Sequence, residues 1–331
     1  MRAAWYERKG PAREVLVVGE MADPEPGPGE VRVRVHASAV NPSDTKQRGG
    51  ARGVLAMPHP RVIPHQDGAG VVDRVGEGVD SSRVGERVWV YEAQRGSPFG
   101  TAADYVVVPA RKAVRLPHGT SFAEGACLGV PAMTAHRCVF ADGPVEGRDL
   151  LVTGGAGAVG CYAIQWARLG NARRIVATVS RPEQEAVARR AGADAVVNYR
   201  TESVVDRVRA LADGGVDRIV EVAFGQNLAQ SVQLARANAV IAAYSSDRVP
   251  EPMLPFWSLL AKDVTVRFVL VYEMPERAHR AAAEAITSAL DRGQLQHQIG
   301  ARFSLAEIAL AHEAQESGEL IGKAVLELVS G

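Results

Sequence analysis

The chain has 331 residues, of which 47% are apolar and 23% are charged, as in ordinary globular proteins and unlike disordered ones. Lysine and arginine together number 38 and so do aspartate and glutamate, so the formal net charge is zero. This balance gives no electrostatic reason to expect nucleic acid or an anionic membrane as a partner.

Cysteine usage and the first residues bear on the compartment. The cysteines Cys127, Cys138 and Cys161 form no CxxC pair, which fits a reducing interior better than a disulfide framework. The N-terminal MRAAWYERKG lacks the apolar core of a signal peptide. No apolar run reaches the length of a membrane span, so we expect a cytoplasmic protein.

The first third of the chain has the pattern of a β-rich unit. Residues 31–40 alternate apolar and polar side chains, which is typical of a strand with one buried face. Further strands are expected at 69–75, 86–91 and 104–108, with glycines between them. Several short strands separated by turns predict a compact β-barrel-like domain.

The pattern changes near residue 120 to strands that alternate with helices. Strands are expected at 149–153, 174–179, 195–198, 217–223 and 238–244, with helices at 158–169, 182–191 and 202–212. Continuous apolar strands between helices predict a parallel sheet covered on both faces. The strand-like 264–272 is expected at a sheet edge. Helices near 276–292 and 304–317 precede a strand at 323–329, which we expect to return to the first domain.

A glycine turn is the strongest signal in the sequence. Gly154, Gly157 and Gly160 follow the apolar strand at 149–153 and open a helix through Ala158 and Val159. The first glycine permits the tight turn, the second lets backbone amides approach a pyrophosphate, and the third permits close packing of helix on strand. The strand–turn–helix context predicts dinucleotide binding.

The next strand indicates which dinucleotide is bound. An NAD site usually has an Asp or Glu about 20 residues further on, which holds the ribose 2′-hydroxyl. Here Ser180 and Arg181 occupy that place. A hydroxyl and a guanidinium bind a 2′-phosphate by charge-assisted hydrogen bonds. The sequence therefore predicts NADPH.

Several segments resemble one known family. They include PEPGPGEVRVRVHASAVNPSDTKQRGG at 24–50, IPHQDGAGVVDRVGEGV at 63–79, VTGGAGAVG at 152–160 and IGKAVLELV at 321–329. They are similar to the medium-chain dehydrogenase/reductase superfamily and, within it, to the zinc-free quinone oxidoreductase (zeta-crystallin-like) branch.

The resemblance implies an α/β protein with a discontinuous GroES-like β-barrel catalytic domain and a Rossmann domain with a doubly wound parallel sheet. We expect the catalytic domain at 1–126 and 273–331 and the NADPH-binding Rossmann domain at 127–272. It also implies a homodimer that forms through the edge strand 264–272.

A catalytic metal is not expected. In zinc-dependent members of the superfamily, a histidine ligand stands where this chain has Gln66, and a cysteine ligand stands where it has Val130. Asp67 alone does not supply the three protein ligands that catalytic zinc needs. His65 points to the opposite face from its neighbour Gln66, so we expect it to be a turn or packing residue.

The resemblance also implies site residues. Asn41, Asp44 and Lys46 lie in the segment NPSDTKQRGG, which resembles the active-site segment of the branch. Asn41 is expected near the nicotinamide and the substrate carbonyl, where an amide donates and accepts hydrogen bonds. Lys46 stands where quinone reductases often have Tyr. It is either a proton donor, if burial lowers its pKa, or a solvated lysine.

Further residues are expected at the cofactor. Thr134 is expected near the carboxamide, Tyr199 near the 2′-phosphate, Ser245 in the nicotinamide pocket and Lys323 at the cofactor or cleft. Arg48 and Asp67 are open to a structural interpretation, as an ion-pair residue and as a residue that orients a barrel loop.

The leading function is that of an NADPH-dependent, metal-free reductase of quinones or related conjugated carbonyls. The first alternative is an enoyl-thioester or alkenal reductase, which delivers hydride to a C=C bond. Less expected are a non-catalytic NADPH- or RNA-binding protein, against which the balanced charge argues, and a zinc alcohol dehydrogenase.

Overall fold

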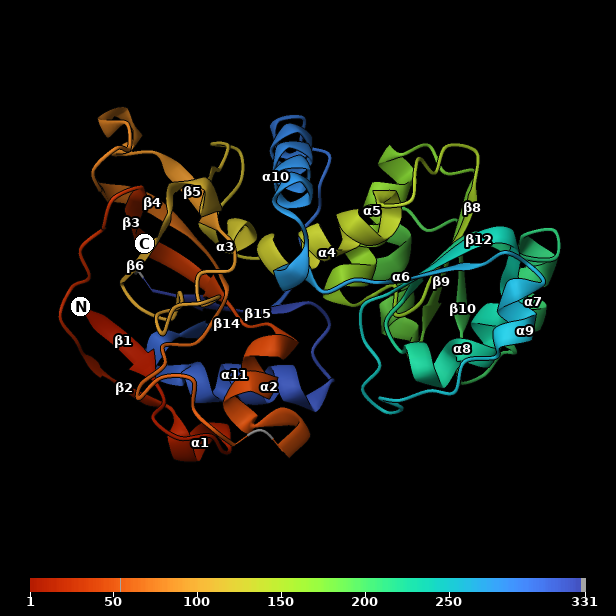
Figure 1. Cartoon of the computed structure of the whole chain (residues 1–331), viewed down its shortest axis with the longest axis horizontal. Helices are drawn as coiled ribbons and strands as arrows, with labels where there is room; N and C mark the ends of the chain where they lie inside the picture. The colour runs from red at the N-terminus through yellow and green to blue at the C-terminus, as the bar shows by residue number, and fades with distance from the viewer. Residues whose placement is uncertain (54, 329–331) are drawn as a thin grey trace. The chain divides into compact units, whose positions relative to one another are not determined.

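The computed structural model describes residues 1–53 and 55–328, and the chain divides into two compact units (Figure 1). The first unit comprises Met1–Val130 and Ala283–Gly331, and the second comprises Pro131–Ala282. The sequence-based boundaries fall at 126/127 and 272/273. Residue 329, in the expected last strand, lies outside the described residues.

The first unit is built on a mixed β-sheet. Its described strands form a seven-stranded sheet in the order β14-β15-β3-β4-β5-β7, with β6 paired to β3. The strands are β3 (Glu30–Ala39), β4 (Asp67–Val75), β5 (Arg87–Val90), β6 (Tyr105–Pro109), β7 (Ala113–Arg115), β14 (Ile299–Ser304) and β15 (Lys323–Glu327). All four strands expected in the first third are confirmed. β15 pairs antiparallel with β3, which confirms that the C-terminal strand returns to this unit.

Shorter elements complete the first unit. A hairpin pairs β1 (Arg2–Trp5) with β2 (Val17–Glu20), and neither this hairpin nor β14 was predicted. The helices are α1 (Ala12–Val15), α2 (Pro42–Gly49), α3 (Phe122–Gly125) and α11 (Ile308–Ser317). The helix α2 begins with Pro42, whose fixed φ suits a first helical position. It is capped after Gly49 by Gly50, which has φ +75°.

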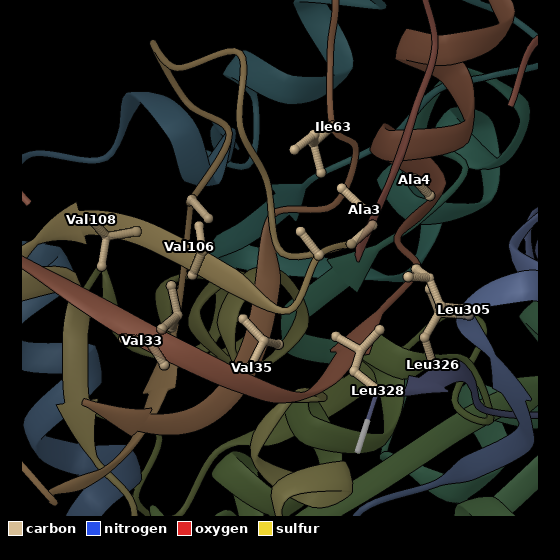
Figure 2. Packing of buried hydrophobic residues seen from close by; sticks show 14 of the residues in the cluster. Ala3, Ala4, Val33, Val35, Ile63, Val106, Val108, Leu305, Leu326 and Leu328 are labelled. Atoms are coloured by element: carbon tan, nitrogen blue, oxygen red, sulfur yellow. The ribbon is translucent and has the colours of Figure 1, made fainter. Parts of the chain in front are cut away.

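The alternation of β3 builds the core of this unit. Val33 and Val35 point to the side on which Val106 and Leu326 also lie (Figure 2), and all four are fully buried or nearly so. Burying a valine or leucine side chain contributes about 1.5–3 kcal/mol. The period of two that predicted the strand therefore also predicted which side chains hold the neighbouring strands together.

The second unit is a parallel sheet with helices in the connections. Its described strands follow the order β10-β9-β8-β11-β12-β13, and every pairing is parallel. The strands are β8 (Asp149–Val152), β9 (Arg174–Val179), β10 (Ala195–Asn198), β11 (Val216–Glu221), β12 (Ala235–Ala243) and β13 (Thr265–Phe268). The helices are α4 (Gly129–Phe140), which begins in the first unit, α5 (Ala158–Leu169), α6 (Pro182–Arg190), α7 (Val204–Leu211), α8 (Phe224–Leu234), α9 (Phe256–Leu260) and α10 (Glu276–Asp291), which ends in it.

Strand order positions the ligand region of the second unit. The chain runs outward from β8 to β9 and β10 on one side and then to β11, β12 and β13 on the other. Ligands of such sheets bind beyond the carboxyl ends of the strands where this order reverses. The glycine turn follows β8 at that point. The expected strand 264–272 lies at the sheet edge, but it ends at Phe268 because Val271–Glu273 form a 3₁₀ turn.

Candidate active site

The first part of the candidate site is the start of α2. Asn41 has an extended backbone and caps this helix, and its backbone N–H donates to Oδ2 of Asp44 at 2.7 Å. A carboxylate at the third helical position that accepts from the capping residue is half of a capping box. Asp44 is 2% exposed. The structure thus gives Asp44 a role in holding Asn41, and its catalytic role stays a prediction.

The side-chain amide of Asn41 lies between two opposite charges. Its Nδ2 donates to Oδ2 of Asp67 at 2.9 Å, and its Oδ1 accepts from Nζ of Lys323. Lys323 also donates to the carbonyl of Val40 at 2.7 Å, and Oδ2 of Asp67 accepts from the backbone N–H of Val130 at 2.9 Å. The ends of β3, β4, β15 and α4 therefore meet at this amide.

Burial sets the electrostatics of this cluster. Asn41, Asp67 and Lys323 are at most 2% exposed. Loss of hydration raises the pKa of Asp44 to about 7 and that of Asp67 to about 6, because burial disfavours a charged carboxylate. The Lys323 ammonium opposes the rise at Asp67, while burial lowers the pKa of Lys323 itself. Both carboxyl groups therefore titrate closer to neutrality than usual.

Lys46 and Arg48 occupy different environments on α2. Lys46 is exposed, so the burial that its proton-donor role requires is not found. Arg48 is 1% exposed and pairs with Glu316 and with the carbonyl of Gly10. The ion-pair interpretation of Arg48 matches this arrangement.

A second buried polar chain escaped the sequence analysis. Ser38 Oγ lies 2.8 Å from Nδ1 of His65 and 2.7 Å from Oγ1 of Thr101, which donates to the Asp67 carbonyl at 2.7 Å. His65 Nε2 lies 2.9 Å from Nε2 of His312. Because the Thr101 hydroxyl donates its only proton to that carbonyl, it accepts the hydrogen bond from the Ser38 hydroxyl. Ser38 Oγ in turn accepts from His65 Nδ1–H. His65 then accepts from His312 Nε2–H, so the chain fixes both neutral tautomers.

The two histidines of this chain are kept neutral. Burial lowers the pKa of His65 well below its ordinary value and lowers that of His312 to about 3. His65 has φ +81°, which fits the expected turn position. His312 gave no sequence signal, since it lies 247 residues from its partner on the buried side of α11.

The glycine turn of the second unit has the shape that a pyrophosphate requires. Gly154 has φ +65°, and a side chain at Gly160 would place its Cβ 2.2 Å from the Gly154 carbonyl oxygen. Gly157 caps α5, so the first-turn amides of Ala158, Val159 and Gly160 lack intrahelical acceptors and lie where a helix attracts anions. The residues present therefore fit a dinucleotide phosphate.

Gly155 is an additional requirement that the sequence analysis did not single out. A Cβ at Gly155 would lie 2.6 Å from Cβ of Ala177 on β9. The repeated glycine in VTGGAG is the sequence signal from which this requirement could have been predicted.

Three predicted cofactor residues follow neighbouring strands. Ser180 and Arg181 come directly after β9, and Tyr199 comes directly after β10. Gln184 Oε1 accepts from the backbone N–H groups of Ser180, at 2.9 Å, and Arg181, at 3.2 Å. Because Gln184 fixes this backbone, the hydroxyl and the guanidinium start from defined positions. Tyr199 is 52% exposed.

A polar pocket of about 400 Å³ brings two of the predicted residues together. Gly154 and Tyr199 both line it, together with Thr153, Thr178 and Glu221. Glu221, which the sequence analysis missed, is fully buried. Its carboxylate accepts hydrogen bonds from Thr153 Oγ1 at 2.9 Å, Ala223 N at 2.6 Å, Asn227 Nδ2 at 2.9 Å and Ser231 Oγ at 3.2 Å.

Ser245 lines a separate, more apolar pocket of about 360 Å³ after β12, beside Phe224, Phe268 and Leu270. Thr134 is 4% exposed and lies within α4. The structure thus places Ser245 and Thr134 apart from the 400 Å³ pocket, and their roles at the nicotinamide stay predictions.

Metal-ligating side chains do not gather in the described residues, where no three His, Cys, Asp or Glu are arranged to hold an ion. Cys127, Cys138 and Cys161 are unpaired and buried, and burial raises the pKa of each to about 12. Among the same residues, no helix has the length and apolar character that crossing a bilayer requires.

Comparisons with known proteins agree with this geometry. The family model described as alcohol dehydrogenase GroES-like domain matches residues 27–118, and the one described as zinc-binding dehydrogenase matches residues 158–288. The chain is 30% identical to a quinone oxidoreductase of Pseudomonas aeruginosa, with 95% of each covered. It is 29% identical to a quinone oxidoreductase of Rattus norvegicus, with 98% of this chain and 96% of the relative covered. It is also 29% identical to a 2-haloacrylate reductase of Burkholderia sp, with 98% of each covered.

Solved structures show the same architecture. A mycobacterial protein complexed with NADPH matches with a TM-score of 0.84 at 26% identity and 99% coverage of both chains. An NAD-dependent alcohol dehydrogenase matches with a TM-score of 0.86 at 29% identity, covering 99% of this chain and 100% of that one. The fold is that of a GroES-like domain joined to a Rossmann domain. The chain belongs to the quinone oxidoreductase family of the medium-chain dehydrogenase/reductase superfamily and is an oxidoreductase.

Proposed function

We propose that the protein is an NADPH-dependent, metal-free quinone oxidoreductase that transfers hydride from NADPH to a quinone or a related conjugated carbonyl. The observation that carries this proposal is the glycine turn after β8, where the Gly154 carbonyl leaves no room for a side chain at Gly160. Family membership supports the acceptor class. Bound NADPH supplies the hydride, and the protein supplies binding, orientation and exclusion of water.

The second unit is proposed to hold the phosphates. First-turn amides of α5 receive the pyrophosphate, and Ser180 and Arg181 receive the 2′-phosphate by charge-assisted hydrogen bonds. Tyr199 lines the same pocket as Gly154 and is proposed to lie near the 2′-phosphate. Ser245 and Thr134 are proposed at the nicotinamide end.

Asn41 is proposed to polarise the acceptor carbonyl. Its oxygen accepts from Lys323 and one N–H donates to Asp67, so the amide has one further N–H to offer. Because Asn41 is 1% exposed, contact with an acceptor requires neighbouring residues to move on binding. Asp44 holds Asn41 in place, and Lys46 is proposed as a hydrogen-bond donor to the reduced oxygen, since its exposure does not supply the burial that the proton-donor role requires.

Reduction of a C=C bond is the second candidate. The similarity to a 2-haloacrylate reductase favours it, since that name describes a conjugated alkene as substrate. Lys46, in place of a stacking tyrosine, is compatible with either acceptor.

The test is NADPH oxidation with an ortho-quinone and, in parallel, with a short enone. Both assays contain EDTA, have NADH as the paired control, and end with product analysis. We expect rapid formation of hydroquinone with NADPH and much slower turnover with NADH. Turnover of the enone alone, giving a saturated carbonyl, contradicts the quinone assignment and supports C=C reduction. Loss of activity in EDTA, with stoichiometric zinc in the protein, contradicts the metal-free mechanism.

We also propose that the protein is a cytoplasmic homodimer that acts on small molecules and has no nucleic-acid or membrane partner. Large apolar side chains are exposed in the edge strand β13 and in the segments that precede and follow it in the chain. They are Met253 (93%), Phe256 (62%), Trp257 (77%), Leu260 (55%), Phe268 (67%) and Leu270 (56%). An apolar patch beside an open strand edge is typical of a protein interface. The zero net charge gives no electrostatic reason for a nucleic-acid or membrane partner. The three unpaired cysteines are consistent with the reducing cytoplasm.

A further inference from the structure

Lys323 is placed where an ammonium group is hard to accommodate. It is 2% exposed, and a buried charge is costly unless it is paired and hydrogen-bonded. Its ammonium donates to the carbonyl of Val40 and to the amide oxygen of Asn41. The sequence analysis expected Lys323 at the cofactor or cleft, and the structure shows it bound to Asn41, the residue that caps α2.

The direction of these hydrogen bonds fixes the Asn41 amide. An ammonium only donates, so the atom facing Lys323 is the amide oxygen. An ionised carboxylate only accepts, so the atom facing Asp67 is the amide nitrogen. If Asp67 were protonated, its hydroxyl would donate as well, and the Lys323 ammonium alone would keep the amide oxygen in place. With Lys323 also removed, the amide would be free to present either end.

Lys323 is the cation that favours ionised Asp67. Its ammonium lowers the pKa of Asp67 against the rise caused by burial. The other titratable or charged groups around this pair come from each neighbouring element: Asp44 of α2, Glu92 after β5 with its partner Lys112, Cys127 before α4, and neutral His65 before β4. Glu92 opposes ionisation of Asp67, and the charges of Asp44 and Asp67 repel each other. Lys323 offsets them more than the hydrogen bonds from Asn41 and Val130 do.

We propose that Lys323 is a positioning residue for the reduction: it keeps Asp67 ionised and thereby holds the Asn41 amide with an N–H, not the oxygen, available to the acceptor. This inference rests on the proposed function. It restricts the acceptor to a group that receives a hydrogen bond, such as a carbonyl oxygen.

The first test is the pH dependence of kcat/KM for quinone reduction by Lys323→Met. Without the ammonium, Asp67 ionises only at higher pH. The rising limb of the profile should therefore move up by more than one pH unit, with about tenfold loss near the midpoint and recovery at high pH. Lys323→Arg should restore the wild-type profile. A uniform loss at every pH, or an unmoved profile, overturns the proposal.

Lys262→Met is the matched control. Lys262 donates to the carbonyls of Val232 and Ala235, both at 2.7 Å, so its removal takes similar hydrogen bonds away from a place remote in sequence from Asn41. Its profile should equal that of the wild type. A shift in the control like that of Lys323→Met overturns the proposal as well.

A second measurement does not depend on activity. In protein with ¹³C-labelled aspartate, the Asp67 carboxyl signal is assigned by its loss in Asp67→Asn. The pH midpoint of that signal should rise in Lys323→Met, and an unchanged midpoint contradicts the inference. If the variant does not fold, the Asn41 side-chain N–H signals of the wild type should shift with the Asp67 titration, and their failure to do so refutes it. Absence of quinone reduction in the wild type instead refutes the proposed function and leaves the carboxyl test valid.

Discussion

At the scale of single residues, we expect the choice between NADPH and NADH to depend on the groups that follow β9. Ser180 and Arg181 stand there on a backbone that Gln184 fixes. A hydrogen bond to a charged group contributes about 1.5–3 kcal/mol. NADPH and NADH differ only at the 2′-position of the adenosine ribose, so a residue that binds the 2′-phosphate affects the affinity for NADPH and not that for NADH.

Arg181→Ala should therefore weaken NADPH binding about 10- to 100-fold and leave NADH binding nearly unchanged. Titration of cofactor fluorescence measures both dissociation constants. Arg189→Ala is the control. Arg189 lies on α6, the helix that follows Arg181, and pairs with Glu185 four residues earlier. Equal losses for the two cofactors would show that Arg181 does not contact the 2′-phosphate.

The same scale shows what residue patterns predict about the site. Glycine positions predicted the turn, because a positive φ and a close approach leave few other residues possible. The partners of Asn41 were not predictable in this way. Lys323 lies 282 residues from Asn41, and they meet only through the register of β15 on β3. Asp67 was noted, but its bond to Asn41 depends on the pairing of β4 with β3.

At the scale of elements, periodicity predicted the strands that carry most of the core. β3 alternates apolar and polar side chains over residues 31–36, whereas the central strands β8 and β9 of the second unit are buried along nearly their whole length. The strands of the hairpin β1–β2 have four residues each and no clear alternation. The strand β14 alternates between half-buried and exposed side chains, but over six residues only, which is too short a pattern to predict it without its pairing partner.

The edge strand β13 allows a direct test of the proposed dimer. Phe268→Glu places a charge in the exposed apolar patch, where desolvating it in an interface is costly. We expect the wild type to sediment at twice the mass of one chain and the variant to dissociate at least 100-fold more readily. Leu310→Glu, on an exposed position of α11, should remain dimeric. A wild-type monomer, or an unaltered Phe268→Glu dimer, would exclude this interface.

At the scale of the whole molecule, the buried groups of the first unit make opposing contributions to stability. The pKa of His312 falls to about 3 and that of His65 also falls, so the unfolded chain binds more protons below about pH 6.5 and stability is lost as pH falls. The pKa values of Asp44 and Asp67 rise to about 7 and about 6. The folded chain therefore binds more protons at those carboxyls above about pH 4, and their contribution is lost as pH rises.

Between about pH 4 and 6 the contributions of His65, His312, Asp44 and Asp67 should cancel one another. Burial also lowers the pKa values of His36 and His297 in this unit, so these two histidines leave a net loss of stability as pH falls. Removing one histidine or one carboxyl leaves a group of the opposite kind uncancelled, so the dependence of stability on pH changes in the variant. Relative to the wild type, His312→Gln should lose about 1.4 kcal/mol of stability per pH unit as pH rises through this range, and Asp44→Asn should gain about as much. Denaturation of ¹⁹F-tryptophan-labelled protein measures these slopes, because the Trp89 signal reports the first unit and the Trp166 signal reports the second. Parallel slopes in the two variants would mean that these groups do not titrate in opposition, and a matching change at Trp166 would mean that the effect is not confined to the first unit.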